Sequence, residues 1–324
     1  MQKTAVLVTG GAGYIGSHAC KALSMAGYLP VTLDNLGQGH REAVRWGPLV
    51  RGNVQDEALV QRILSEHRIE SVLHFAAYAS VAESMQEPGK YFANNVASSL
   101  ALLETARACG VRRIVFSSTC ATYGIPQSER VREDEVQRPV NPYGESKLFF
   151  ERALSWYGAA HGLRSVSLRY FNAAGADPDV EVGELHDPET HLIPLAIDAA
   201  LLKREPLRVC GTDYPTPDGT AVRDYVHVSD LADAHVSALE YLLAGGSSDA
   251  FNLGTGVGSS VRQVIAAVER VAGRPVPRQD APRRPGDPAF LVAAPGRAKE
   301  VLSWTPRRSS IERIVGSAWR WHTR

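Results

Sequence analysis

Tyr143 and Lys147 are two residues of this sequence that could together move a proton near neutral pH. They stand four positions apart, and in a helix that spacing places both side chains on one face. A free phenol, with a pKa of about 10, is a poor base at pH 7, but a neighbouring ammonium stabilises the phenolate and lowers its pKa. The pair therefore predicts a tyrosine that acts as a general base with the support of a lysine. An exposed Tyr and Lys on a surface helix would show the same spacing, so the rest of the chain has to distinguish the two interpretations.

The elements around this pair predict that it lies at one edge of a sheet. Asn141-Pro142 marks the start of a helix over residues 141–158, and residues 113–116 read as a strand that runs into Ser117-Ser118-Thr119. Ligands of doubly wound sheets bind at the carboxyl ends of the strands, so Thr119 and Tyr143 are expected to reach one crevice. There the Thr119 hydroxyl can bond to a substrate oxygen. A turn or helix cap is the alternative role for Thr119.

The first 35 residues predict a dinucleotide site. An apolar run over residues 4–9 predicts a strand, and residues 17–27 predict a helix. Between them lie glycines whose spacing lets backbone N–H groups approach a pyrophosphate: Gly10, Gly13 and Gly16. A second strand over residues 30–33 ends in Asp34-Asn35, where a carboxylate can bind the adenosine ribose diol. The charge of Asp34 would repel a 2′-phosphate, so the predicted cofactor is NAD rather than NADP.

Strands and helices continue to alternate after the second strand, which predicts an α/β fold with a doubly wound parallel sheet. Further strands are predicted at 49–52, 71–75 and 113–116. After Arg169 the alternation loosens, and Pro and Gly become frequent. We therefore predict an NAD-binding Rossmann domain over residues 1–170, to which residues 221–250 return, and a smaller mixed α/β substrate domain over 171–324.

Composition argues against several classes of protein. The 324 residues carry a formal net charge of zero, so no overall field attracts nucleic acid or an acidic membrane. The four cysteines are scattered without metal-site spacing, which argues against a disulfide framework or a bound metal and for a reducing compartment. No apolar run approaches the length of a membrane span, and the start lacks a signal-peptide pattern. The expected location is the cytoplasm.

Taken together, the motifs resemble the extended short-chain dehydrogenase/reductase superfamily, and within it the UDP-galactose (UDP-glucose) 4-epimerases, over essentially the whole chain. The motifs are VTGGAGYIGSH at 8–18, SST at 117–119, YGESK at 143–147, RYFNAAGA at 169–176, HLIP at 191–194, GTDYPTPDGTAVRDYVHVSDLADAH at 211–235, NLGTGVGSSV at 252–261 and APRRPGD at 281–287. The resemblance implies inversion at C4 of a UDP-hexose through a 4-keto sugar, with NAD regenerated in each turnover. It also implies a homodimer built from the helices near 91–109 and 141–158.

The resemblance assigns roles residue by residue. Thr119, Tyr143 and Lys147 are the implied catalytic residues. The implied NAD-binding residues are Gly10, Gly13, Tyr14, Ile15, Gly16, Asp34, Asn35, Asn53, Val54, Phe75, Ala76, Asn94, Ser117, Tyr143, Lys147 and Phe171. The implied substrate-binding residues are Thr119, Tyr143, Asn172, Leu192, Arg208, Arg223, Arg284 and Asp287. Of these, the two arginines Arg223 and Arg284 suit the diphosphate, because a guanidinium binds phosphate oxygens bidentately.

The chain departs from the family pattern at four positions. Asn53 stands where an Asp is typical, and its carbonyl can still accept from the adenine amine. Ala79 replaces a Lys of some members, and Cys210 replaces an aromatic residue near the uracil. Leu291 stands where the family has Tyr or Cys, at the position that sets the room around the 2-substituent of the sugar. N-acetylated substrates are therefore neither supported nor excluded.

Other functions fit the sequence less well. A sugar-nucleotide 4,6-dehydratase would need an Asp-Glu pair after Thr119, and this chain has Cys120-Ala121 there. A 4-epimerase of UDP-N-acetylglucosamine or UDP-glucuronate differs only in the sugar pocket and stays open. A non-enzymatic NAD-sensing protein stays possible on the same fold, although such proteins often lack the Tyr or the Lys.

Overall fold

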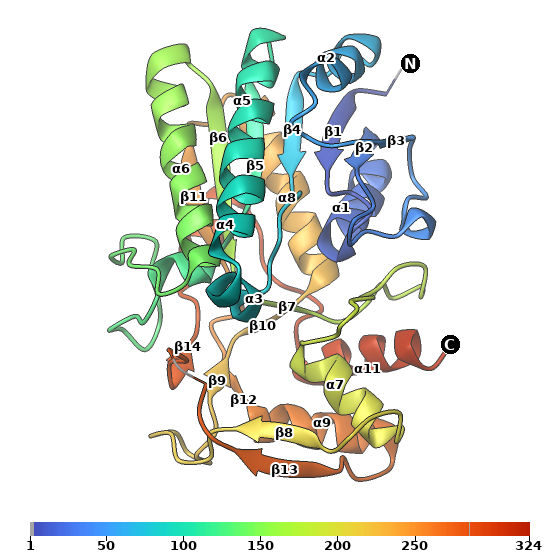
Figure 1. The fold of residues 1–324 in the computed structure, drawn as a ribbon, viewed down its shortest axis with the longest axis vertical. Helices are drawn as coiled ribbons and strands as arrows, with labels where there is room; N and C mark the ends of the chain where they lie inside the picture. Colours follow the sequence, from blue (N-terminus) through green and yellow to red (C-terminus); the bar gives the residue numbers. More distant parts are fainter. Residues whose placement is uncertain (1–2, 285) are drawn as a thin grey trace.

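The structure is a computed structural model that describes residues 3–284 and 286–324, so Pro285 of the APRRPGD motif lies outside the described residues. Its main layer is a parallel sheet of seven strands in the order β11-β6-β5-β4-β1-β2-β3 (Figure 1). The strands are β1 (Ala5–Thr9), β2 (Leu29–Asp34), β3 (Leu49–Arg51), β4 (Ser71–His74), β5 (Arg113–Thr119), β6 (Arg164–Tyr170) and β11 (Asp249–Leu253). The strand order reverses between β1 and β4, and doubly wound sheets bind their ligands at such a reversal. The predicted fold class is confirmed.

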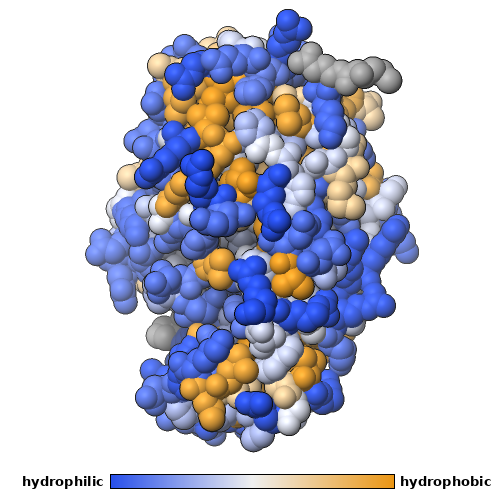
Figure 2. Space-filling view, turned by 90° about the vertical axis from the view of Figure 1, so that its right-hand side faces the viewer, coloured by the Kyte–Doolittle hydropathy of each residue, from blue (hydrophilic) through white to orange (hydrophobic). Residues whose placement is uncertain are grey.

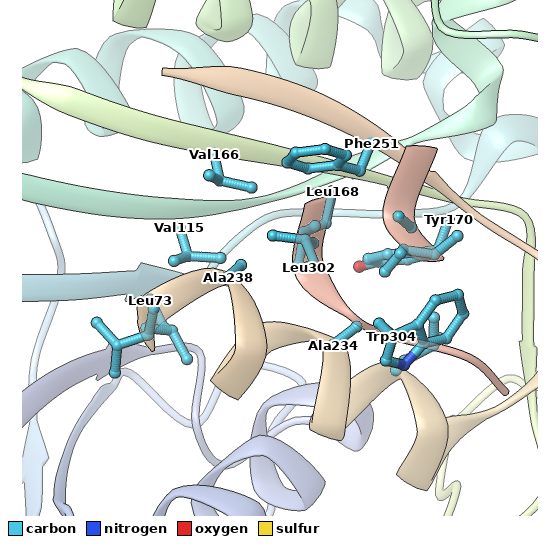
Figure 3. Packing of buried hydrophobic residues seen from close by; sticks show 14 of the residues in the cluster. Leu73, Val115, Val166, Leu168, Tyr170, Ala234, Ala238, Phe251, Leu302 and Trp304 are labelled. Carbon is cyan, nitrogen blue, oxygen red and sulfur yellow. The ribbon is translucent and has the colours of Figure 1, made fainter. Parts of the chain in front are cut away.

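Helices cover both faces of this sheet and make two hydrophobic cores. Val6 and Val8 of β1 join the core shared with α1 (Tyr14–Met25), α8 (Val228–Leu243) and α10 (Gly296–Leu302), part of which Figure 3 shows. Ala5 and Leu7 point to the opposite core. That second core includes α2 (Glu57–Glu66), α5 (Ser99–Ala108) and α6 (Pro142–His161). A strand that is buried on both faces reads as a continuous apolar run, which explains the lack of alternation in residues 4–9.

The helix predicted over residues 91–109 is not continuous. After α3 (Val81–Gln86) and α4 (Pro88–Tyr91), a π-helical segment, η2 (Phe92–Ser98), precedes α5. A π segment widens the helix locally and is often found at functional sites.

The second half of the chain contributes both to the sheet and to a separate layer at the carboxyl ends of its strands (Figure 1). Its third core gathers α7 (Leu192–Ala200), α9 (Val261–Ala272), α11 (Ile311–His322) and β8 (Leu207–Cys210). Small sheets complete it: β10 (Tyr225–His227) with β7 (Asn172–Ala174), β8 with β13 (Arg278–Ala281), and β9 (Val222–Arg223) between β12 (Ser259–Ser260) and β14 (Phe290–Leu291). Two short 3-10 helices also occur: η1 (Arg41–Ala43) lies between β2 and β3, and η3 (Cys120–Tyr123) follows β5. The crevice that the sequence predicts would lie between these layers, at the carboxyl ends of the strands.

The surface turned to the right of Figure 1 is largely polar, with apolar residues in separate patches (Figure 2). Within residues 3–284 and 286–324, no helix is both long and apolar enough to cross a membrane.

Candidate active site

The glycine turn after β1 is shaped for close approach of a phosphate. Gly10 has φ of 74°, and a Cβ on it would lie 2.6 Å from the backbone nitrogen of Ala76, at the end of β4. A Cβ on Gly16 would lie 2.2 Å from the Gly10 carbonyl oxygen. Gly13 starts α1 without a side-chain cap, and the first turn of that helix carries no acidic residue. An uncapped helix N-terminus behind a turn that excludes side chains fits the pyrophosphate of a dinucleotide.

The far end of the same site carries the predicted ribose ligand. Asp34 Oδ2 accepts from the Ala12 backbone N–H at 3.0 Å, and its Oδ1 accepts from the Leu36 N–H at 2.8 Å. Asn35 Nδ2 donates to Asn53 Oδ1 at 2.9 Å, so these two predicted cofactor residues meet. Because the Asp34 carboxylate is fixed beside the glycine turn, its charge stands where the adenosine ribose of NAD would bind.

Further predicted cofactor residues follow the ends of β4 and β3 or lie in the π segment. Phe75 and Ala76 directly follow β4, and Val54 follows β3, where it packs on the second core. Asn94 donates from Nδ2 to Asn95 Oδ1 at 2.9 Å. The sequence singled out Asn94-Asn95 but assigned only Asn94 to the cofactor site, whereas Asn95 is the one buried in the π segment. Only the doubled Asn-Asn in a helical stretch signalled it.

Asn95 joins the loop after β4 to the helix that carries the Tyr–Lys pair. Its Oδ1 accepts from the Tyr78 N–H at 2.9 Å, and its Nδ2 donates to the Tyr78 carbonyl at 3.0 Å and to Ser146 Oγ at 3.1 Å. Ser146 stands between the two members of the pair in sequence. The π segment therefore places an amide that fixes α6 against the crevice.

Thr119 and Tyr143 meet as predicted. Asn141 caps α6, its Oδ1 accepting from the Gly144 N–H at 2.8 Å, which sets Tyr143 in the first turn of the helix. Thr119 ends β5, and its hydroxyl lies close enough to the buried Tyr143 to act against the rise of the phenol pKa. The same hydroxyl accepts from the Ala121 N–H at 3.1 Å, so Thr119 is also the turn cap that was its alternative role.

The electrostatics of the pair differ from the sequence expectation. Burial raises the pKa of Tyr143 above that of a free phenol, and the Thr119 hydroxyl offsets this only in part. Lys147 Nζ donates to the Ser117 carbonyl at 2.8 Å and lies 4.9 Å from the centre of the Phe116 ring. Burial lowers the pKa of Lys147 to about 7, against the opposing effect of Glu151. The predicted lowering of the Tyr143 pKa is therefore wrong for the protein chain alone, because desolvation weakens the cation and disfavours the phenolate together.

The predicted substrate side centres on a partly buried ion pair. Arg223 on β9 donates to the Asp287 carboxylate and to the Pro288 carbonyl at 2.7 Å. Burial raises the pKa of the Cys120 thiol to about 12, and the nearby charge of Arg223 works against that rise. Cys120 directly follows Thr119, so the charge of Arg223 is felt at the end of β5. Two predicted substrate residues 64 positions apart thus meet.

The remaining predicted ligand-binding residues differ in burial and location. Phe171 is buried with Cys120, and Leu291 packs against the same cluster. Asn172 lies on β7, Leu192 begins α7 and packs on the third core, and Arg208 and Arg284 are exposed. Ile15 packs on the first core, whereas the Tyr14 hydroxyl donates to the Gly175 carbonyl at 2.6 Å and so ties α1 to the second half of the chain.

Tyr225 was missed by sequence reasoning. It is buried on β10, and burial raises the pKa of its phenol to about 12; Arg223 and Arg284 act to lower it and Asp287 to raise it. Tyr225 therefore stands among the charges expected around a diphosphate. Its position two residues after Arg223 in the VRDYV stretch was the available signal.

Comparisons with known proteins agree with this geometry. Residues 6–254 match the model of the NAD dependent epimerase/dehydratase family. The UDP-glucose 4-epimerase of Rhizobium meliloti (strain 1021) is 53% identical over 324 residues, which is 100% of this chain and 98% of that protein. The crystal structure of UDP-glucose 4-epimerase from Brucella ovis in complex with NAD is 48% identical, with a TM-score of 0.96 over 98% of both chains.

A further solved structure contains both ligands. The UDP-glucose 4-epimerase from Bifidobacterium longum in complex with NAD⁺ and UDP is 38% identical, with a TM-score of 0.93 over 99% of this chain and 98% of that one. These likenesses extend over both halves of the crevice described above. The chain therefore belongs to the NAD dependent epimerase/dehydratase family, among its UDP-glucose 4-epimerases.

Proposed function

We propose that this protein interconverts UDP-glucose and UDP-galactose by inverting C4 of the sugar, with tightly held NAD. The proposal is supported by Thr119 at the end of β5 beside Tyr143, by the bond from Lys147 to the Ser117 carbonyl on the same strand, and by the Arg223–Asp287 ion pair in the second half of the chain. A dinucleotide and an anionic nucleotide sugar would thus share one crevice.

In this proposal Tyr143 takes the proton of the C4 hydroxyl and Thr119 aligns that hydroxyl by a hydrogen bond. Lys147 holds the nicotinamide ribose. Bound NAD⁺ would supply the hydride acceptor for C4 and a positive charge near the phenol. Because the pKa of Tyr143 is raised in the chain alone, a positive charge that enters the crevice favours the phenolate.

The NAD-binding residues proposed are those of the glycine turn, Asp34 and the strand ends described above. For the diphosphate we propose Arg223, with Arg284 and Asn172, and for the uridine ribose Asp287. Leu291 pairs in register with Arg223 across β14 and β9. This pairing supports its assignment to the sugar pocket, where it would act on the choice between plain and N-acetylated hexoses.

The deciding experiment incubates purified protein with UDP-galactose, UDP-glucose or their N-acetylated forms, without added NAD, and resolves the products by chromatography. We expect the UDP-galactose and UDP-glucose reactions to reach the same mixture. Conversion of the N-acetylated sugars alone would instead indicate a 4-epimerase of UDP-N-acetylglucosamine. No conversion of any of these sugars would reject the proposal and favour an NAD-sensing protein.

Tyr143→Phe is the matched mechanistic control. It removes the proton acceptor but preserves the ring, so we expect NAD content to stay unchanged while epimerisation falls by about 10²-fold or more. Near-normal turnover of this variant would remove Tyr143 from the mechanism.

We also propose a homodimer. Phe149 and Trp156 lie seven positions apart on α6 and are 48% and 74% exposed, whereas Leu148 and Leu154 of the same helix face the core. Residues seven apart share one helix face, so α6 presents an apolar stripe that a second copy could cover.

A further inference from the structure

Glu151 lies on α6 one turn beyond Lys147, and its side chain is only 8% exposed. Its Oε1 accepts from the Ser118 hydroxyl and from Arg169 Nε, the latter at 3.0 Å. Its Oε2 accepts from Arg169 Nη2 at 2.6 Å and from Gln137 Nε2 at 3.3 Å. One buried carboxylate thus receives donors from several directions.

These donors connect Glu151 to the catalytic side chains. Ser118 stands between Ser117, whose carbonyl accepts from Lys147, and Thr119, whose hydroxyl acts to lower the pKa of Tyr143. Arg169 lies opposite Ser118 in the β5–β6 register. The carboxylate therefore fixes α6 to two strands at the level of the crevice.

We propose that Glu151, held in place by Arg169, is a positioning residue that keeps the Lys147 ammonium charged and directed into the crevice. This inference rests on the proposed function of the same site. Glu151 does not touch the predicted ligands and acts only through Lys147 and the end of β5.

The charges around Lys147 support this role. The groups that face it are Tyr143 and Glu151 from α6, His74 from β4, Tyr170 from β6 through its bond to Ser117, and the Phe116 ring from β5. Burial raises the pKa of both tyrosines and lowers the pKa of His74 to about 3, so these three groups are neutral near pH 7. Among the described groups that face Lys147, Glu151 is therefore the one that supplies negative charge, and Arg169, which pairs with it, offsets part of that charge.

Arg169 explains how a carboxylate can be buried at this place. A lone buried charge is costly, whereas a two-point contact with a guanidinium offsets much of the desolvation. An open pocket of about 490 Å³, lined by Glu151, Ser155, Arg164, Arg169 and Asp249 among others, borders the pair, and Lys147 is not among its lining residues. An amide in place of the carboxylate thus has room to adjust without repacking the core.

The direct test measures the titration of Lys147 in wild type and in Glu151→Gln, which keeps the shape and loses the charge. The sequence has six lysines, so protein labelled with ¹³C at lysine Cε gives few NMR signals, and Lys147→Arg identifies the one that belongs to Lys147. We expect the midpoint of the Lys147 titration to move to lower pH in Glu151→Gln, while the other lysines keep theirs. An unchanged midpoint would overturn the proposal, even if the variant melts at a lower temperature.

The second readout is the pH profile of kcat. In Glu151→Gln we expect the fall of kcat on the alkaline side to move to lower pH, with about a tenfold loss at pH 8 and a KM for the UDP-sugar within about twofold. Glu312→Gln is the matched control, because that exposed glutamate pairs only with the exposed Arg270 on α9. An equal loss at every pH would mean a purely structural role and would overturn the proposal.

The two readouts separate this inference from the proposed function. If the wild type converts no UDP-sugar, the proposed function fails, and the NMR titration still decides whether Glu151 controls the charge of Lys147. If the wild type is active and both profiles are unchanged in Glu151→Gln, the inference alone fails.

Discussion

At the scale of single residues, Arg223 carries the sharpest prediction about the substrate. Its guanidinium is buried and holds Asp287, so its loss leaves both a diphosphate and a carboxylate under-compensated. We expect Arg223→Ala to weaken UDP binding by about 2–4 kcal/mol, measured by calorimetry. The amount of NAD extracted from the variant should equal that of wild type. Arg313→Ala, on α11, serves as the control, and equal UDP affinity of all three proteins would count against the assignment of the diphosphate site.

At the scale of elements, the turn that leads into α1 has the least tolerance. We expect Gly16→Ala to lose bound NAD, because the added Cβ would meet the Gly10 carbonyl oxygen at 2.2 Å and open the turn. The measurement is nucleotide released from denatured protein. Gly89→Ala is the control: nothing lies within 4 Å of its added Cβ, and Ala in a helix gains about 0.5–1 kcal/mol over Gly. Retention of full NAD content in Gly16→Ala would contradict the reading of this turn as the pyrophosphate site.

The exposed stripe of α6 makes a second prediction at this scale. Trp156→Glu places a charge on the apolar face that the proposed dimer would bury, so we expect a monomer mass by light scattering at micromolar concentration. Leu202→Glu, after α7, is the matched control, because Leu202 is 75% exposed and Trp156 is 74% exposed. This variant should leave the dimer intact. A monomeric wild type would rule out this interface.

At the scale of the whole molecule, a charged cluster ties the segment before α7 to the rest of the fold. Burial alone would raise the pKa of Glu184, but His191 and His186 lower it to about 2. Burial likewise opposes charge on His191, yet Glu184 and Glu189 raise its pKa to about 10. The Trp321 indole on α11 donates to the Glu184 carbonyl at 2.9 Å, so the cluster connects to the C-terminal helix.

The two shifts define a pH window of stability. The contribution of Glu184 to folding stability is complete above its unfolded pKa of 4.5 and is lost as pH falls towards 2. The contribution of His191 is complete below its unfolded pKa of 6.5 and is lost as pH rises towards 10. We expect the stability difference between wild type and His191→Gln, from urea unfolding, to be largest near pH 5–6 and to shrink towards pH 10. The effect should be modest, because the His191 side chain is 53% exposed and solvent screens its charge. A difference that does not change with pH would contradict this assignment, and His67→Gln at the end of α2 provides the control.

Local patterns were enough to predict the parts of this protein that depend on a few neighbouring residues. The glycine spacing, Asp34 at the end of the second strand and the Tyr143–Lys147 spacing are of this kind, since turn geometry and helix periodicity act over less than two turns. The sheet could also be predicted, because short continuous apolar runs between helices are typical of parallel strands that are buried on both faces. The start of α1 at Tyr14 rather than Ser17 shows the limit, since a glycine cap has no side-chain signal.

Only the tertiary structure decided how these parts act on one another. The pairing of Arg223 with Asp287 spans 64 positions, and that of Glu151 with Arg169 joins a helix to a strand, so neither follows from spacing. Nor does the direction of the Tyr143 pKa, because the sequence shows the lysine nearby but not the burial that outweighs it. Burial is a property of the whole packed chain: each group's solvation depends on elements far away in sequence, and desolvation and charge pairing are felt only after those elements have met.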